Sequence, residues 1–365
     1  MWISGLTAPR LAMAYDSQAV EKTAKPKHWS RGSSDNPVNA VQVLLYYLYI
    51  DLADVEAVLR EQAQWCEELL LKGRVRVAAE GLNGTLDGSR FAIVEYRRRM
   101  DALFGEGTIH WKLADYPEDC EKRFKGLSVK LCKEVISTDL DEESRRAVLA
   151  AGPGRHLSPK EWHQELLNPD PNLVLIDTRN FYEVRIGKFE PATNRCDDNG
   201  TGAAAAEAAK KVIDPFTRSF SDLRRWVESS GEESLKNKRV LMYCTGGVRC
   251  ERASALIKAM VPDTLGVFQL HGGIHAYLEE YAESEESTFK GKLFVYDPRV
   301  ATPATAKHVV GKCLVCSAPW DDYSFQTRCG KCRVLVLVCD VCRLQAQERD
   351  GEADQVVCEQ CLDRR

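Results

Sequence analysis

The sequence predicts a multidomain protein that combines the α+β and α/β fold classes and ends in a metal-bound module. Strand and helix signals in residues 38–136 follow the order β-α-β-β-α-β, which is the ferredoxin-like arrangement. Residues 157–285 alternate near-continuous apolar runs with helical spacing, as in a parallel sheet that helices cover on both faces. Residues 312–365 hold eight of the 14 cysteines in four Cys-x-x-Cys pairs, a pattern typical of metal binding.

Each element of the N-terminal domain has a local signal. β-branched and aromatic residues predict its strands, and Asp51 or Asp54 can cap its first helix. The expected elements are strand 41–50, helix 54–71, strand 74–79, turn 81–84, strand 85–87, helix 89–104, strand 109–113 and a further pairing segment at 124–136.

Two polar stretches flank this domain. Residues 1–37 mix Ser, Pro, Lys, Gly and Asp without periodicity, which predicts a flexible leader. Residues 137–156 end in Gly152-Pro153-Gly154 and are expected to form a linker. A capping box of Ser158 and Glu161 then starts the first helix of the central domain.

The central domain is expected to carry its chemistry at the carboxyl ends of its strands. The apolar run 173–176 delivers Asp177 and Arg179 to that edge, and the run 239–243 delivers Cys244. Sites in open α/β sheets form at this edge, so we expect Asp177 and Arg179 to share a rim with the Cys244 loop.

Cys244 is the candidate reactive residue. A cysteine between a buried strand and a helix start lies where backbone N–H groups converge, and two following glycines allow these amides to turn inward. Such a place lowers a thiol pKa and favours a thiolate or a persulfide. The alternative is a buried core cysteine beside an ordinary glycine turn, which the glycines and a loop arginine disfavour. The predicted active-site loop is Cys244, Thr245, Gly246, Gly247, Val248 and Arg249.

The length of this loop separates two chemistries. Four residues lie between Cys244 and Arg249, whereas cysteine phosphatases have five between the same residue types. A shorter loop makes a smaller cradle, which suits a sulfur atom or a small oxyanion better than a phosphate ester. Cys250 follows directly and is either a resolving or supporting thiol or a core cysteine of the next helix.

The loop, together with Leu-Ile-Asp-Thr-Arg at 175–179 and Leu-His-Gly-Gly-Ile at 270–274, resembles a rhodanese domain. The longer string 244–254 and Phe-Val-Tyr-Asp-Pro-Arg-Val at 294–300 narrow the resemblance to the rhodanese-type tRNA uridine hydroxylase family and its eukaryotic rhodanese-domain relatives. The resemblance implies an acylphosphatase-like N-terminal domain and oxygen-dependent 5-hydroxylation of the wobble uridine in tRNA. It also implies that Asp177 and Arg179 support or face the active-site loop, and we count them with Cys244, Arg249 and Cys250 as catalytic candidates.

Two segments of the central region differ from classical rhodaneses. Residues 196–213 form an insertion near the expected substrate face, before the recognisable Asp214–Phe220 string. Residues 286–311 lie beyond the point where single-domain rhodaneses stop, and we expect this extension to pack back onto the central domain.

The C-terminal module is predicted to bind two structural zinc ions. Eight thiolates fill two tetrahedral sites, and metal binding would supply much of the folding energy of so short a segment. The pairs combine either sequentially or in an interleaved order. The predicted ligands are Cys313, Cys316, Cys329, Cys332, Cys339, Cys342, Cys358 and Cys361.

The composition limits which kinds of partner the protein can have. Fifty basic residues stand against 54 acidic ones, a formal net charge of −4, so contact with RNA must use local patches. No apolar run approaches the length of a membrane span, and cysteines in metal pairs favour a cytoplasmic location. No organic cofactor is evident, and the oligomeric state is not indicated. The weak candidates for RNA binding, which a solvated rim explains equally well, are Arg74, Arg76, Lys122, Arg123 and Lys125.

Three hypotheses about function follow. The first and favoured one is a tRNA uridine hydroxylase that uses Cys244. The second is a sulfurtransferase that passes a Cys244 persulfide between a sulfur donor and an acceptor. The third is a zinc-module interaction protein whose rhodanese domain is not catalytic.

Overall fold

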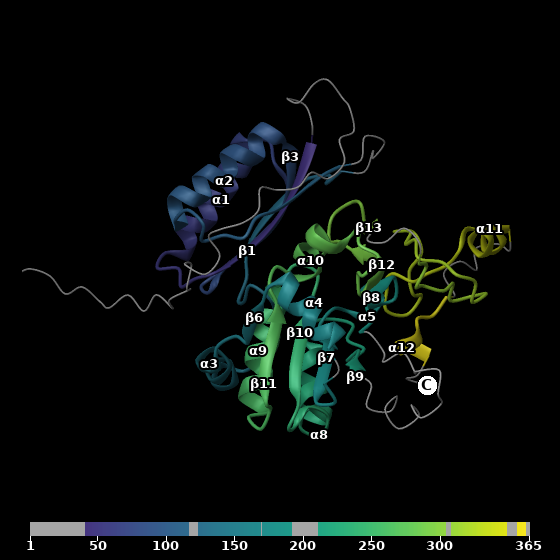
Figure 1. Ribbon diagram of the computed structural model, residues 1–365. Coiled ribbons are helices and arrows are strands. Elements are labelled where there is room, and N and C mark those ends of the chain that lie inside the picture. Colours follow the sequence, from purple (N-terminus) through teal and green to yellow (C-terminus); the bar gives the residue numbers. More distant parts are fainter. Residues whose placement is uncertain are drawn as a thin grey trace, which may run out of the picture. The chain divides into compact units, whose positions relative to one another are not determined.

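Three sheets and a cysteine-rich module organise the described part of the chain (Figure 1). The computed structural model describes residues 41–116, 123–168, 170–191, 211–303, 308–348 and 356–362, all within one compact unit, Val38–Arg365. The leader expected at 1–37 lies outside the described residues. Among the described helices, none is both long and apolar enough to cross a membrane.

The N-terminal sheet has the strand order β4-β1-β3-β2-β5, and α1 and α2 cover one face of it (Figure 1). β5 runs parallel to β2 and the other neighbours are antiparallel, which confirms the predicted mixed, acylphosphatase-like sheet. Asp54 and Ser89 cap the two helices by accepting hydrogen bonds from backbone N–H groups. The elements are β1 (Val41–Tyr49), α1 (Val55–Glu68), β2 (Lys72–Ala78), β3 (Gly81–Ser89), α2 (Arg90–Phe104), β4 (Lys112–Asp115) and β5 (Leu127–Leu131).

The prediction of a turn at residues 81–84 is wrong. Those residues open the central strand β3, which pairs with β1 from Gly81 opposite Tyr49 to Ser89 opposite Val41. The reversal of the chain occurs at residues 79–80. Gly84 serves close packing, because a Cβ atom there would lie 2.3 Å from the Tyr46 ring.

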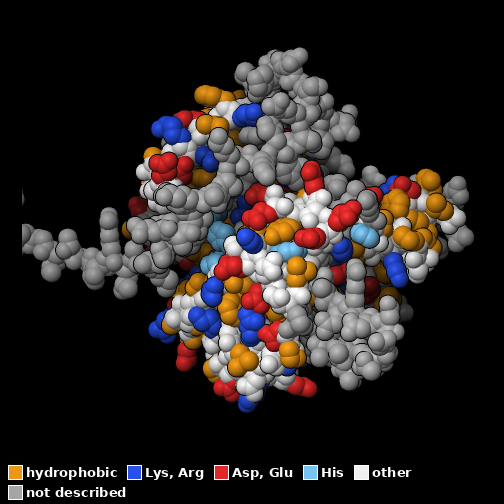
Figure 2. Space-filling model, viewed as in Figure 1, with side chains coloured by type: hydrophobic (Ala, Val, Ile, Leu, Met, Phe, Trp, Pro, Cys, Tyr) orange, Lys and Arg blue, Asp and Glu red, His pale blue; other side chains and the backbone are white. Residues whose placement is uncertain are grey.

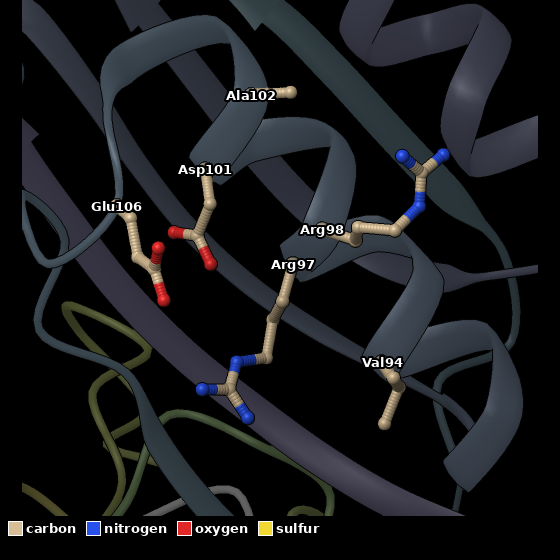
Figure 3. A pocket seen from close by; sticks show the side chains of 6 residues that line it. All are labelled: Val94, Arg97, Arg98, Asp101, Ala102 and Glu106. Carbon is tan, nitrogen blue, oxygen red and sulfur yellow. The ribbon is translucent and has the colours of Figure 1, made fainter.

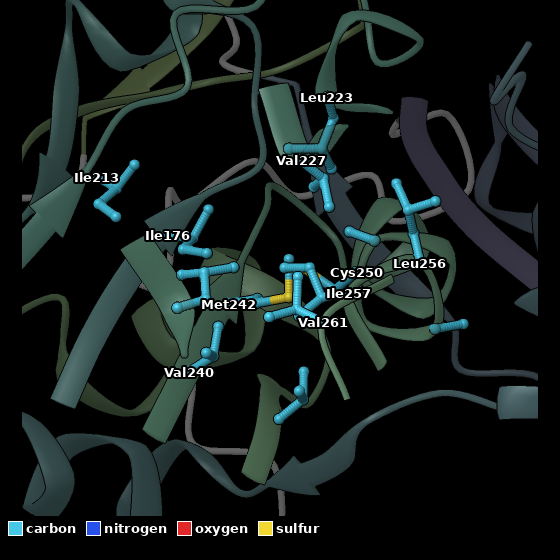
Figure 4. Close-up of a cluster of buried hydrophobic side chains, with 14 of the residues drawn as sticks. Ile176, Ile213, Leu223, Val227, Val240, Met242, Cys250, Leu256, Ile257 and Val261 are labelled. Atoms are coloured by element: carbon cyan, nitrogen blue, oxygen red, sulfur yellow. The ribbon is translucent and has the colours of Figure 1, made fainter. Parts of the chain in front are cut away.

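The central sheet has the order β6-β11-β10-β7-β9, and all its neighbours are parallel, as predicted. Successive residues of β10 point to opposite faces, so Val240 and Met242 enter one core while Leu241 and Tyr243 enter the other. Figure 4 shows the first core, in which α9 packs Leu256 and Ile257 against β10. The elements are β6 (Arg155–Leu157), α4 (Pro159–Leu167), β7 (Leu173–Asp177), α5 (Phe181–Val184), β9 (Lys211–Ile213), α7 (Asp222–Trp226), the π-helical turn η2 (Val227–Gly231), α8 (Glu232–Leu235), β10 (Arg239–Tyr243), α9 (Val248–Met260), β11 (Gly266–Leu270) and α10 (Gly273–Tyr281).

The segment 137–156 is more ordered than the expected linker. It contains the helix α3 (Glu142–Ala151), which Asp141 caps, and the beginning of β6. Val148 of α3 is buried in the same core as α9. Part of the predicted linker therefore completes one face of the central domain.

The extension after the central domain packs back onto it, within the residues described. β12 (Phe289–Phe294) pairs with β8 (Gly187–Phe189) and with β13 (Ala301–Pro303) in an antiparallel sheet. Most of the insertion at 196–213 lies outside the described residues, but its last three residues form β9 beside β7.

The cysteine-rich module is joined to the central domain by a shared core. Phe181 of α5 is buried in one cluster with Val336, Val338 and six of the eight cysteines of the module. Arg185 also pairs with Glu359 of the module at 3.0 Å. The helices of the module are α11 (Asp340–Glu348) and α12 (Glu359–Leu362).

Candidate functional site

Cys244 lies between the end of β10 and the start of α9, where the strand-loop-helix pattern placed it. Its side chain is fully buried. The loop returns to the helix through Gly247, whose φ of +98° favours glycine, and the N–H group of Gly247 donates to the Cys244 Sγ at 3.1 Å. At least one amide of the loop therefore faces the sulfur.

The surroundings of Cys244 favour its thiolate. Burial alone would raise the pKa, but a hydrogen bond from the Cys250 thiol, the charge of Arg249 and the backbone N–H groups of both residues outweigh it. The pKa of Cys244 falls to about 5. The Cys250 thiol is fully buried and keeps its proton, because burial and the neighbouring thiolate raise its pKa. A third group, the Thr178 hydroxyl, lies 3.6 Å from the Cys250 Sγ.

Arg249 is held by a carboxylate that was not among the predicted site residues. Its Nη1 and Nη2 donate to the two oxygens of Glu183 at 2.6 and 2.8 Å, and Glu183 is fully buried. Tyr296 of the extension and Thr245 of the loop also donate to Glu183, at 2.7 and 3.2 Å. A capping signal was available in the sequence, since the Glu183 carboxylate accepts from the N–H of Asn180, three residues earlier.

Asp177 and Arg179 form an ion pair with each other. Arg179 Nη2 lies 2.6 Å from Asp177 Oδ2 and also donates to the carbonyl oxygen of Gly187, and both side chains are buried. The Arg179 guanidinium lies 5.6 Å from the centre of the Tyr243 ring, on the opposite face of the sheet from the Cys250 core. Asp177 and Tyr243 line a cavity of about 280 Å³ on that side. The pair thus supports the end of β10, directly before Cys244.

The N-terminal domain contributes side chains to the Cys244 loop, which the sequence did not indicate. A Cβ atom on Gly247 would lie 2.8 Å from the Tyr47 hydroxyl, and one on Gly246 would lie 3.7 Å from the Cδ and Cε atoms of Lys112. The Lys112 Nζ lies 5.0 Å from the centre of the Tyr47 ring. The contacts with Gly246 and Gly247 join residues more than a hundred positions apart, and no local pattern predicts them.

The RNA-binding candidates lie on the N-terminal sheet, apart from Lys122, which is outside the described residues. Arg74 and Arg76 are exposed on one face of β2. Arg74 lies over the ring of Phe124, which stands in the sequence between Arg123 and the exposed Lys125. The structure therefore brings Arg74 close to this segment. On the face that Figure 2 shows, described basic and acidic side chains are interspersed.

A second cavity, of about 520 Å³, lies on the outer side of α2 (Figure 3). Its charged lining is mixed, and Arg98 there is paired with Glu95 at 2.7 Å. None of the predicted site residues lines this cavity. Its lining residues are Val94, Arg97, Arg98, Asp101, Ala102 and Glu106.

The eight cysteines of the C-terminal module form two clusters in an interleaved order. Within each cluster the four Sγ atoms lie within 4.8 Å of one another, a spacing that fits one metal ion. The N–H groups of Cys339 and Cys358 donate to the sulfurs of Cys313 and Cys329, as expected of thiolate ligands. The first cluster is Cys313, Cys316, Cys339 and Cys342, and the second is Cys329, Cys332, Cys358 and Cys361.

A parallel α/β domain with a cysteine loop between its central strand and the following helix defines a rhodanese-like protein. Comparison with known families agrees: residues 159–280 match the rhodanese-like domain, 41–135 the UPF0176 acylphosphatase like domain, and 290–362 the rhodanase C-terminal family.

Individual relatives extend the match over most of the chain. A tRNA uridine(34) hydroxylase of Brucella canis is 34% identical over 76% of this chain and 80% of its own length, and one of Oceanobacillus iheyensis is 33% identical over 77% and 78%. Rhodanese-like domain-containing protein 6 of Arabidopsis thaliana is 36% identical over 87% of this chain, which spans 52% of that protein. The chain belongs to the rhodanese-type tRNA uridine hydroxylase family.

Proposed function

We propose that the protein is a tRNA-modifying enzyme that hydroxylates the wobble uridine at C5 in an oxygen-dependent reaction, with Cys244 as the reactive thiol. The observation that carries the proposal is the thiolate environment of Cys244, in a chain that shares its three regions with proteins named tRNA uridine(34) hydroxylases. A cytoplasmic location is part of the proposal, because reduced thiols persist in a reducing compartment.

Each candidate residue has a role in this scheme. The Cys244 thiolate is the nucleophile, and the loop amides with Arg249 stabilise its charge. Glu183 fixes the orientation of Arg249, and the Asp177–Arg179 pair supports the strand end behind the loop. The exposed Arg74 and Arg76 provide phosphate contacts on the N-terminal sheet.

Cys250 assists by supplying a proton and electrons. Insertion of one oxygen atom of O₂ at C5, with release of the other as water, consumes two electrons and two protons; the Cys250 thiol supplies one of the protons and solvent supplies the other. A neighbouring dithiol supplies two electrons when it closes to a disulfide, and a cellular thiol then reduces that disulfide. The Cys250 thiol is among the groups that lower the pKa of Cys244, so it is the candidate partner for this exchange.

The two cysteine clusters are proposed to hold structural zinc. Four thiolates in a tetrahedral set leave no open position for a substrate, so the ions stabilise the fold of the module and take no part in the reaction. Through Arg185–Glu359 and the Tyr323 hydroxyl, which donates to the carbonyl of Tyr182, the module braces the turn that carries Glu183.

Nucleoside analysis of tRNA tests the proposal. Cells that lack the gene are expected to lose 5-hydroxyuridine-type nucleosides, and re-expression of the protein restores them while the Cys244→Ser variant does not. Cys66→Ala is the matched control, because Cys66 is equally buried but lies in the N-terminal core. Unchanged 5-hydroxyuridine in the deleted strain would refute the proposal. Thiocyanate release from thiosulfate and cyanide would then point to the sulfurtransferase instead.

A further inference from the structure

Lys112 of β4 is a buried cation without a hydrogen-bond partner among the described residues. Its side chain is 7% exposed, and its Nζ contacts no acceptor. A buried ammonium without a hydrogen bond is unfavourable unless a negative charge compensates it. The position of Lys112 therefore calls for a nearby anion.

The Cys244 loop packs directly on Lys112. The aliphatic part of Lys112 packs on Gly246, where a Cβ atom would lie 3.7 Å from Lys112 Cδ and Cε. It also packs on Gly272, after β11, where a Cβ atom would lie 4.0 Å from Lys112 Cε. The end of the side chain is thus directed along the loop that holds the Cys244 sulfur, over the Tyr47 ring.

We propose that Lys112 is a positioning residue of the Cys244 centre, whose ammonium is supplied by the N-terminal domain and stabilises the ionised sulfur held in the loop. The inference rests on the proposed role of Cys244 as a reactive thiolate. It assigns the N-terminal domain a part in the chemistry as well as in RNA binding.

The other charged groups around Lys112 do not replace this partner. Burial lowers the pKa of Lys112 to about 8, and the charges of Cys244, Glu279 and Glu251, in that order, oppose the decrease. Glu251 is already engaged, with His156 at 2.8 Å and with Gln269. Burial raises the pKa of Glu279 above its ordinary value. The remaining titratable groups that face Lys112 are His110, His271 and His275, whose pKa values burial and neighbouring cations lower, so they are neutral.

The sulfur is in turn surrounded on the other sides. Cys250 and Arg249 of α9 lie beside it, and Tyr47 and Tyr49 of β1 lie near the same loop. Their hydroxyls donate to Glu251 and to the carbonyl oxygen of Val248, both at 3.4 Å, and burial raises their pKa values. The tyrosines are neutral at physiological pH. Among the residues that the structure describes, Lys112 and Arg249 are the cations that lie against the loop, and Arg249 is already paired with Glu183.

The titration of Cys244 tests the proposal. The ultraviolet absorbance of its thiolate is measured against pH in the full-length protein, as the difference between each variant and the same variant carrying Cys244→Ser. In Lys112→Met we expect the midpoint to rise by about one pH unit, the lower range for loss of a nearby opposite charge. Lys112→Arg restores the charge and is expected to return the midpoint toward the native value. Lys133→Met, an exposed lysine of the same domain, is the matched control.

The outcomes separate the two proposals. A native midpoint near that of an ordinary thiol would overturn the thiolate premise of the proposed function, whatever Lys112 does. A low native midpoint that Lys112→Met leaves unchanged, or that Lys133→Met shifts equally, would overturn the role of Lys112 alone. Should Lys112→Met not fold, the neutral Lys112→Gln takes its place in the same comparison.

Discussion

Replacement of Glu183 by glutamine is predicted to destabilise the active-site loop far more than loss of one ordinary surface ion pair. The substitution keeps the shape of the side chain and removes its charge. Arg249, only 7% exposed, would then be a buried cation without the carboxylate as its counter-ion. One of its two hydrogen bonds to residue 183 would also be lost, because the glutamine NH₂ group is a donor and cannot accept from the guanidinium. Breaking a buried ion pair from one side costs about 3 to 5 kcal/mol.

Hydrogen exchange provides the assay, because a multidomain chain has no single unfolding transition. Peptides that cover β10 and α9 report the local free energy of opening in the native protein and in Glu183→Gln. Glu228→Gln is the matched control: Glu228 pairs with Arg224 at 2.7 Å but is 42% exposed, and its loss should cost at most about 1 kcal/mol. Equal effects of the two substitutions would refute the reasoning, since burial and the additional hydrogen bonds to Glu183 distinguish the pairs.

The same pair sets a dependence on pH. Burial raises the pKa of Glu183, but the charge of Arg249 and its hydrogen bonds outweigh burial, and the net pKa lies below the ordinary value. A carboxylate with a lowered pKa stabilises the fold above its ordinary pKa, and this contribution is lost as the pH falls through the lowered one. The difference between the native protein and Glu183→Gln should therefore shrink in acid, and a difference that grows there would contradict the assignment.

Three further predictions concern the sulfur, the metal clusters and the N-terminal sheet. Cys250→Ala should raise the midpoint of Cys244 ionisation because a donor is lost, whereas Cys250→Ser should retain most of the native value; equal midpoints would remove the hydrogen bond from the account. The double variant Cys316→Ser/Cys339→Ser should keep one zinc ion by elemental analysis, because both residues belong to one cluster, whereas sequential pairing would leave none. Gly84→Ala should destabilise the N-terminal domain by about 1 to 3 kcal/mol through overpacking in denaturant titrations, and Gly126→Ala, with open space around it, should not.

Local chemistry predicted most of the secondary structure. The caps at Asp54 and Ser158 each accept the expected hydrogen bond, because capping depends only on residues within one turn. The apolar runs before Asp177 and Cys244 identified the parallel strands, because a strand buried on both faces is apolar at every position and does not alternate with polar residues.

Contacts between residues far apart in the sequence could not be predicted from local patterns. The glycines at 81–84 look like a turn, but they permit close approach within a central strand. Of the site, the loop and Cys250 followed from local spacing, whereas Lys112 and Tyr47 reach it only because two domains meet there. The helix α3 buries only one residue, Val148, so its place in the core of the central domain was not evident from the sequence.

The interleaved order of the cysteine pairs governs when the module can form during synthesis. Each cluster draws on both halves of the segment, so neither is complete until Cys342 has been made, and the second must await Cys361. In a sequential arrangement, the first two Cys-x-x-Cys pairs could have formed a complete cluster while the rest of the chain was still inside the ribosome. Here the brace behind the Glu183 turn is assembled last, and a chain that ends before Cys361 has its central domain made but unsupported.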